Sequence, residues 1–153
     1  MPNIEEQNLT EFLLEVKTKM ANITTSENIE INNMNEYVLK NSGKFIRSKI
    51  IYLYGSEIGV RKQKLIELAS TAELIHLSTL IHDDIIDEAD LRRDMPTVVK
   101  KWGVKKAILY GDFLYTKTFQ ELNSFDNTAI ANVLINCAEA LIEGEFNQLK
   151  IKD

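Results

Sequence analysis

The stretch from Lys62 to Glu88 constrains the fold most, because it has the pattern of one long apolar helix that ends in a cluster of aspartates. Its apolar residues spread around the helix instead of forming a single stripe: Leu74, Ile75, Leu77, Leu80, Ile81, Ile85 and Ile86. A helix that is apolar on most sides is buried inside a larger helical assembly. The segment therefore predicts a central helix against which the rest of the chain packs.

The remaining chain also has a helical pattern. Its 153 residues include only six glycines and two prolines, and no segment alternates as a half-buried strand would. We predict an all-α fold with further helices over about Ile4 to Met20, Ser26 to Gly43, Phe45 to Ile58, Val98 to Trp102, Lys105 to Leu122 and Thr128 to Leu149. Ser26 is the expected N-cap of the second helix and Gly43 its closing glycine, and the third helix should stop near Gly59. Residues 89–96, which are rich in charge and end in a proline, are expected to form a loop.

Composition narrows the function classes. The length suits one domain with a real core, and the chain is 44% hydrophobic and 27% charged. A net charge of -5 argues against general nucleic-acid binding, although local basic clusters can still bind phosphate. Cys137 is the only cysteine, which excludes an internal disulfide and suits a protein of the reducing cytoplasm. It falls within an apolar helical stretch, so we expect it in the core. We expect no signal peptide and no transmembrane segment.

The central helix ends in Asp83-Asp84-Ile85-Ile86-Asp87, which places three carboxylates within about one turn. Asp87 shares a face with Asp83 (i, i+4) and with Asp84 (i, i+3), and like charges at these spacings repel. The negative end of the helix dipole adds to that cost. A bound divalent cation would reverse both effects, and carboxylate oxygens suit Mg²⁺. The alternative is a solvated acidic helix end, but the apolar flanks favour the metal site, because buried carboxylates must be paired, protonated or metal-bound.

Basic residues that could bind phosphate occur in two places. Lys44 and Arg47 stand at the start of the third predicted helix, where free N–H groups and the positive dipole end favour an anion. The alternative is a pair of solvated charges. Arg92 and Arg93 follow the aspartates, where they either contact a ligand or form local salt bridges with Asp90 or Asp94.

One histidine is aligned with the aspartates. His76 precedes Asp83 by seven residues, which turns it only about 20° around the helix. It is either a hydrogen-bonded core residue or a ligand contact, and the alignment favours the contact. Carboxylates for metal, basic clusters for phosphate and an apolar helical interior together predict a diphosphate substrate with a hydrocarbon tail.

The motifs resemble those of a known family. The segment from Glu73 to Arg93 resembles the first aspartate-rich region of the trans-polyprenyl diphosphate synthases, and Ser42 to Arg47 resembles their GKxxR segment. Further pieces follow in the family's order: Pro96-Thr97, Trp102-Gly103, Gly111 to Leu114 and Glu143 to Gln148. The resemblance begins near residue 35 and is closest to the long-chain branch, such as the heptaprenyl and octaprenyl diphosphate synthases.

The resemblance implies the N-terminal half of the isoprenoid-synthase helical bundle and prenyl transfer. Mg²⁺ held by Asp83, Asp84 and Asp87 would bind an allylic prenyl diphosphate, whose ionisation gives a carbocation that isopentenyl diphosphate attacks. The resemblance places isopentenyl diphosphate and the allylic diphosphate against these substrate-binding residues: Lys44, Arg47, His76 and Arg93 for the former, and Arg92 for the latter.

The resemblance also assigns product length and the cavity wall. In this family the residues four and five positions before the first aspartate help to set product length; here they are Thr79 and Ser78. Their small side chains predict a product longer than farnesyl. Glu145 and Gln148 fall where family members line the cavity.

The chain departs from the family pattern in length and in three residues. Family members are about twice as long and carry a second aspartate-rich motif, so residues 1–153 are expected to be a truncated single helical domain that is inactive alone. It is either a fragment, a half-length subunit that needs a partner, or a non-catalytic binding or assembly module. Apolar faces left uncovered predict a homodimer or higher homo-oligomer.

Three residues also depart from the family pattern. Phe45 stands where the family commonly has a basic residue, Ser48 where it has proline and Asp94 where it has glycine. Terpene-cyclase chemistry is a further alternative, which the arginine pair disfavours.

Overall fold

The computed structural model describes residues 4–152, and over this range the chain forms seven helices and one short hairpin. The helices are α1 (Ile4–Ile23), α2 (Ile29–Lys40), α3 (Ile46–Glu57), α4 (Lys62–Ile86), α5 (Val98–Trp102), α6 (Val104–Asn123) and α7 (Thr128–Lys152). The strands are β1 (Leu91–Arg92) and β2 (Met95–Pro96). The predicted all-α fold is confirmed, and every predicted helix is present with ends that differ by a few residues.

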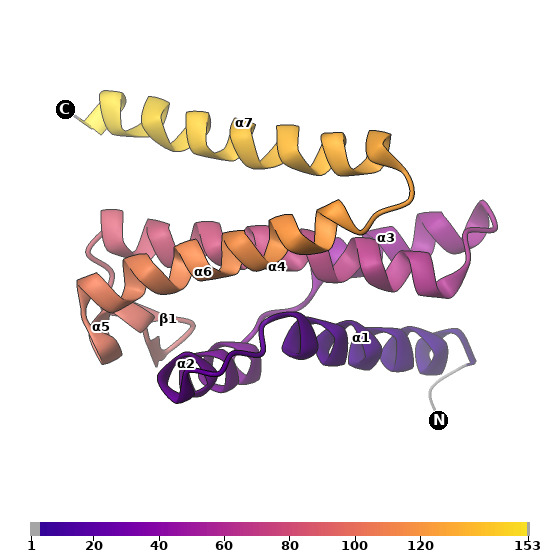
Figure 1. Ribbon diagram of the computed structural model, residues 1–153, viewed down its shortest axis with the longest axis horizontal. Helices are drawn as coiled ribbons and strands as arrows, with labels where there is room; N and C mark the ends of the chain where they lie inside the picture. Colours follow the sequence, from indigo (N-terminus) through magenta and orange to yellow (C-terminus); the bar gives the residue numbers. More distant parts are fainter. Residues whose placement is uncertain (1–3, 153) are drawn as a thin grey trace.

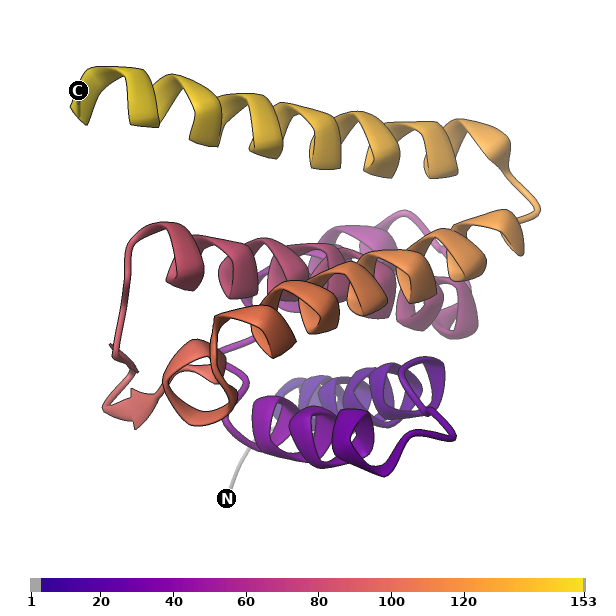
Figure 2. The same cartoon turned by 60° about the vertical axis from the view of Figure 1, so that its left-hand side comes forward.

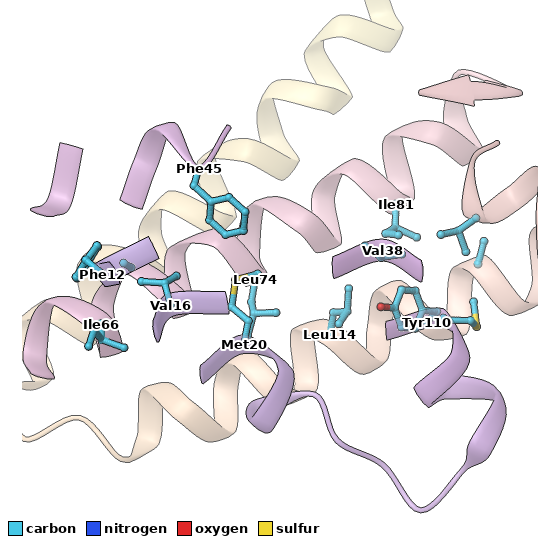
Figure 3. Packing of buried hydrophobic residues seen from close by; sticks show 14 of the residues in the cluster. Phe12, Val16, Met20, Val38, Phe45, Ile66, Leu74, Ile81, Tyr110 and Leu114 are labelled. Atoms are coloured by element: carbon cyan, nitrogen blue, oxygen red, sulfur yellow. The ribbon is translucent and has the colours of Figure 1, made fainter. Parts of the chain in front are cut away.

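The helix α4 is the centre of the assembly. It contacts α1, α3, α5, α6 and α7. Figures 1 and 2 show α1 and α2 on one side of the layer that contains α3, α4 and α6, with α7 on the other side. The core cluster draws side chains from several of these helices, shown in Figure 3, including Phe12, Val16, Met20, Val38, Leu74, Ile81, Tyr110 and Leu114. The prediction of a buried central helix is therefore confirmed.

The second helix is shorter than predicted at both ends. Its N-cap is Asn28, whose side chain accepts hydrogen bonds from two backbone N–H groups of the first turn. The Ser26 hydroxyl instead accepts from the backbone N–H of Asn28, before the helix begins. The helix ends at Lys40, so Gly43 does not close it. Asparagine is as good an N-cap as serine, and the two cannot be separated by pattern alone. By contrast, Gly59 closes α3 with a φ of +76°, as predicted.

The predicted loop over residues 89–96 contains a tight antiparallel hairpin. Leu91 pairs with Pro96 and Arg92 with Met95, and the two residues between the strands are Arg93 and Asp94. Both have positive φ, 54° and 62°, which is the signature of a type I′ turn. The twist of this turn matches that of the strands, so a charged segment closes without glycine.

Helix α7 lies on the outside of the assembly (Figure 2). Ala138 is the only buried residue in the stretch 128–150, and Cys137 is exposed, so the prediction of a core cysteine is wrong. The two residues are adjacent on the helix, and a rotation of about 100° separates them. Ala138 faces the bundle and Cys137 faces away.

Within residues 4–152, no helix combines the length and the apolar character that a bilayer crossing requires.

Candidate functional site

A cleft opens between α4, the connection from α2 to α3, and the hairpin that carries the arginine pair. Its empty volume is about 880 Å³, part of which is open to solvent. The five residues predicted to bind substrate all line it: Lys44, Arg47, His76, Arg92 and Arg93. They come from three separate segments of the chain. Of the three predicted metal ligands, only Asp84 lines the same cleft.

The start of α3 presents its two basic residues through an unusual backbone. Phe45 is the N-cap, has a φ of 52° and is buried in the core cluster. Lys44 and Arg47 on either side of it are exposed. Phenylalanine has no polar side-chain group with which to cap a helix, and Phe45 makes no side-chain cap. The buried ring therefore anchors the segment while the two basic side chains remain available to a ligand.

A carboxylate that was not predicted as a site residue accepts hydrogen bonds from this helix start. Glu73 Oε1 accepts from the Ser48 backbone N–H at 3.1 Å and from the Ser48 hydroxyl at 3.0 Å. Both residues are buried, and Glu73 also lines the cleft. The only sequence signal was a glutamate in the predicted buried central helix, three residues before His76.

Arg93 reaches the cleft across Gly43. A Cβ built on that glycine would collide with the Arg93 guanidinium. The glycine predicted to close α2 therefore has another role: its lack of a side chain lets the arginine of the hairpin lie against the α2–α3 connection. This contact joins two of the segments that form the cleft.

Arg92 pairs with the second aspartate of the acidic motif. Its Nε donates to Asp84 Oδ1 at 2.9 Å and to Oδ2 at 3.2 Å, and its Nη2 lies 2.8 Å from Oδ1. Asp84 is only 5% exposed. The sequence left open a salt bridge with Asp90 or Asp94; the partner is instead in α4, and Asp90 pairs with Lys100 at 2.9 Å.

His76 is held neutral by its surroundings. Burial, and to a smaller extent the positive charges of Arg47, Arg92 and Arg93, together lower the pKa of His76 from 6.5 to about 4. A neutral imidazole can still donate one hydrogen bond to a phosphate oxygen. The three arginines that act on His76 are the ones that line the cleft, so the site has a strongly positive local field despite the acidic chain.

Asp83 and Asp87 lie outside the cleft, at the C-terminal end of α4. Burial raises the pKa of Asp83, and the nearby Glu145, Asp87 and Asp84 carboxylates add to this rise, against an opposite effect of Arg92. Asp87 is exposed and forms the C-cap of α4. Among the side chains of residues 6–150, no three His, Cys, Asp or Glu are gathered tightly enough to hold a metal by themselves. The acidic field at Asp83 is nevertheless what a divalent cation would relieve.

The predicted product-length residues are buried in α4. Ser78 is fully buried and its hydroxyl donates to the Ile75 carbonyl at 2.7 Å, while the Thr79 hydroxyl donates to the His76 carbonyl at 2.8 Å. The predicted cavity-lining residues are on α7, where Glu145 is half-buried and Gln148 exposed. Neither Glu145 nor Gln148 lines the basic cleft.

Comparison with known proteins identifies the class. The sequence profile of the Polyprenyl synthetase family matches residues 28–153. The octaprenyl diphosphate synthase of Escherichia coli (strain K12) is 34% identical over 119 residues, which are 78% of this chain and 37% of that protein. The heptaprenyl diphosphate synthase component 2 of Geobacillus stearothermophilus is 30% identical over 144 residues, 94% of this chain and 45% of that protein.

A solved structure extends the likeness to the fold. The decaprenyl diphosphate synthase from Rhodobacter capsulatus superposes with a TM-score of 0.88 at 30% identity, covering 94% of this chain and 45% of that one. The chain belongs to the polyprenyl synthetase family of prenyltransferases and has the all-α isoprenoid-synthase fold. It spans less than half the length of these relatives.

Proposed function

We propose that this chain carries the isopentenyl diphosphate cleft and the magnesium-binding aspartates of a long-chain trans-polyprenyl diphosphate synthase. The reaction would add isopentenyl diphosphate to an allylic prenyl diphosphate. The observation that carries the proposal is the convergence of Lys44, Arg47, His76, Arg92 and Arg93 on one cleft. Four cations and a neutral imidazole around one opening match a diphosphate, whose several oxygens accept charge-assisted hydrogen bonds.

In this proposal the cleft residues bind and orient isopentenyl diphosphate. Lys44 and Arg47 act at the start of α3, where the helix dipole also favours an anion, and His76 donates one hydrogen bond as the neutral imidazole. Arg93 contacts the same diphosphate from the hairpin. Arg92, paired with Asp84, faces the allylic diphosphate, so that the two substrates would meet beside the end of α4.

Asp83 and Asp87 are the proposed magnesium ligands. They share one face of the helix end, and Mg²⁺ commonly takes one or two protein carboxylates together with water and substrate phosphates. A group of three gathered carboxylates is therefore not required. Asp84, the third predicted ligand, would have to leave Arg92 to reach the same ion. Magnesium bound there would supply the charge that stabilises a departing diphosphate.

Ser78 and Thr79 are the proposed determinants of product length, because Thr79 lies one turn before Asp83 on nearly the same face of α4. In a competent synthase, replacing both by phenylalanine should shorten the extracted products. Ser78→Ala with Thr79→Ser is the matched control, because neither substitution makes the side chain larger. Products of unchanged length from a folded Phe variant would contradict the assignment.

A non-catalytic subunit or diphosphate-binding module is the second candidate. The Arg92 pair that holds Asp84 favours it, because this pair removes one carboxylate from metal binding. Terpene-cyclase chemistry is disfavoured by the second basic cluster at Lys44 and Arg47, which a single diphosphate substrate does not need.

The homo-oligomer and the cytoplasmic location stay predictions. Light scattering during size-exclusion chromatography would test the predicted homo-oligomer.

The deciding experiment incubates the chain with labelled isopentenyl diphosphate, farnesyl diphosphate and Mg²⁺, and sizes the extracted products. Elongated products would establish prenyl transfer by this chain alone. Magnesium-dependent binding of farnesyl diphosphate without turnover would support the module. Absence of binding by either diphosphate at millimolar concentration would contradict both candidates.

A further inference from the structure

We infer that Glu73 is a positioning residue for the diphosphate cleft, because its carboxylate on α4 caps the first turn of α3 and so fixes Lys44 and Arg47. The inference rests on the proposed function of the cleft and adds a residue to it. Glu73 does not itself contact the ligand in this proposal. It acts through the helix start that carries two of the ligand-binding cations.

The contact is buried, and one carboxylate oxygen accepts both hydrogen bonds. Glu73 Oε1 accepts from the Ser48 N–H at 3.1 Å and from the Ser48 hydroxyl at 3.0 Å. The exposed fractions are 8% for Glu73 and 0% for Ser48. Because both groups are buried, removing the carboxylate would leave a backbone donor and a hydroxyl without their acceptor.

The start of α3 needs this contact because it has no cap of its own. The N–H groups of a first helical turn have no partner inside the helix, and a local Ser, Thr, Asn or Asp usually satisfies one of them. Here the N-cap is Phe45, in a left-handed conformation that is unfavourable for an aromatic residue. Glu73 supplies the missing acceptor from another helix, and its negative charge suits the positive end of the α3 dipole.

The same contact sets the register of α3 against α4. Glu73 lies on the α4 face that also presents His76 and Asp84, since these positions are three and eleven residues further along the helix. All three line the cleft. Fixing Ser48 to Glu73 therefore fixes the distance from Lys44 and Arg47 to His76. A diphosphate that must contact all of them at once is sensitive to that distance.

The test measures binding of inorganic pyrophosphate to the full chain by titration calorimetry. Glu73→Ala should weaken binding about tenfold, within the range that loss of a cap produces. Glu73→Gln should stay within about threefold of the original chain, because the amide oxygen can still accept both hydrogen bonds. Arg47→Ala serves as the partner mutation of a double-mutant cycle. In that background the added effect of Glu73→Ala should fall below about threefold, since Glu73 acts through the residues beside it.

Two results of the binding titrations would overturn the inference. In the first, Glu73→Ala leaves the affinity for pyrophosphate unchanged. In the second, the loss of affinity in the double variant equals the product of the losses caused by Glu73→Ala and Arg47→Ala alone. If Glu73→Ala does not fold, Ser48→Ala takes its place, with an expected twofold to threefold loss that disappears beside Arg47→Ala. Hydrogen exchange at the Ser48 amide distinguishes a failure of the Glu73 cap from a failure of the proposed cleft function. Exchange that Glu73→Ala does not accelerate refutes the cap itself, whereas an original chain that binds no pyrophosphate refutes the proposed function and the inference with it.

Discussion

The Arg92 guanidinium holds the Asp84 carboxylate by two nitrogens, with Nε and Nη2 at 2.9 Å and 2.8 Å from Oδ1. This pair divides the acidic motif into two parts with different surroundings. Asp84 is buried beside the cations of the cleft, whereas Asp83 lies among other carboxylates near α7. Neighbouring aspartates of one motif are thereby given different chemistry.

That division predicts different results for two matched substitutions. Asp83→Asn should abolish the magnesium-dependent part of allylic diphosphate binding, because it removes a proposed ligand. Asp84→Asn should change this part by less than about threefold and instead lower the free energy of unfolding by about 1–2 kcal/mol, since Arg92 loses its charged partner. Calorimetry with and without Mg²⁺ and urea unfolding would measure the two effects. The opposite pattern would make Asp84 the principal ligand.

Gly43→Ala should weaken isopentenyl diphosphate binding by displacing Arg93. The new methyl group would occupy the position of the guanidinium, so we expect a fivefold to tenfold loss of affinity, or about 1–1.4 kcal/mol. The control is Gly144→Ala in α7, where the added methyl meets nothing within 4 Å. That variant should bind normally and gain about 0.5–1 kcal/mol of stability. Equal affinities for the two variants would rule out the Arg93 contact.

Asp94→Gly should stabilise the hairpin, because Asp94 has a φ of 62° in the turn and glycine adopts this backbone conformation without strain. We expect the free energy of unfolding, measured by thermal denaturation, to rise by about 0.5 kcal/mol. Asp94→Asn tests the charge separately, since asparagine tolerates the left-handed region and is neutral. Both variants should raise pyrophosphate affinity about twofold by removing a negative charge beside Arg93. Affinity that rises only for the glycine variant would show that backbone strain matters and charge does not.

His76 should titrate near pH 4 in the free protein, which NMR can follow because the chain has only two histidines. Its pKa is lower in the folded state than the ordinary 6.5, so the unfolded chain binds more protons between these values. Stability should therefore fall as the pH drops from about 6.5 to 4, and His76→Gln should flatten this dependence. Added pyrophosphate should raise the pKa of His76 by offsetting the neighbouring arginines. A pKa that remains unchanged with ligand would place the anion elsewhere.

Much of this molecule could be predicted from local pattern. The apolar positions between Lys62 and Ile86 repeat around a helix, and this alone indicates a buried central element. Gly59 ends α3 as expected, because a closing glycine acts within one turn. Where two polar residues could cap the same helix, as with Ser26 and Asn28, pattern could not choose. The prediction of a buried Cys137 was wrong for a related reason: an apolar helix pattern does not tell how much of the helix surface another helix covers.

The sequence by itself determined the all-α class, the order of the helices, and the residue types that could bind metal and diphosphate, because these depend on periodicity and chemistry within short segments. Only the tertiary structure decided which of those groups meet. The Arg92–Asp84 pair, the packing of Arg93 on Gly43 and the cap from Glu73 to Ser48 each join separate elements. Such contacts follow from how helices dock and how a tight turn aims its side chains, and both are settled by packing of the whole core.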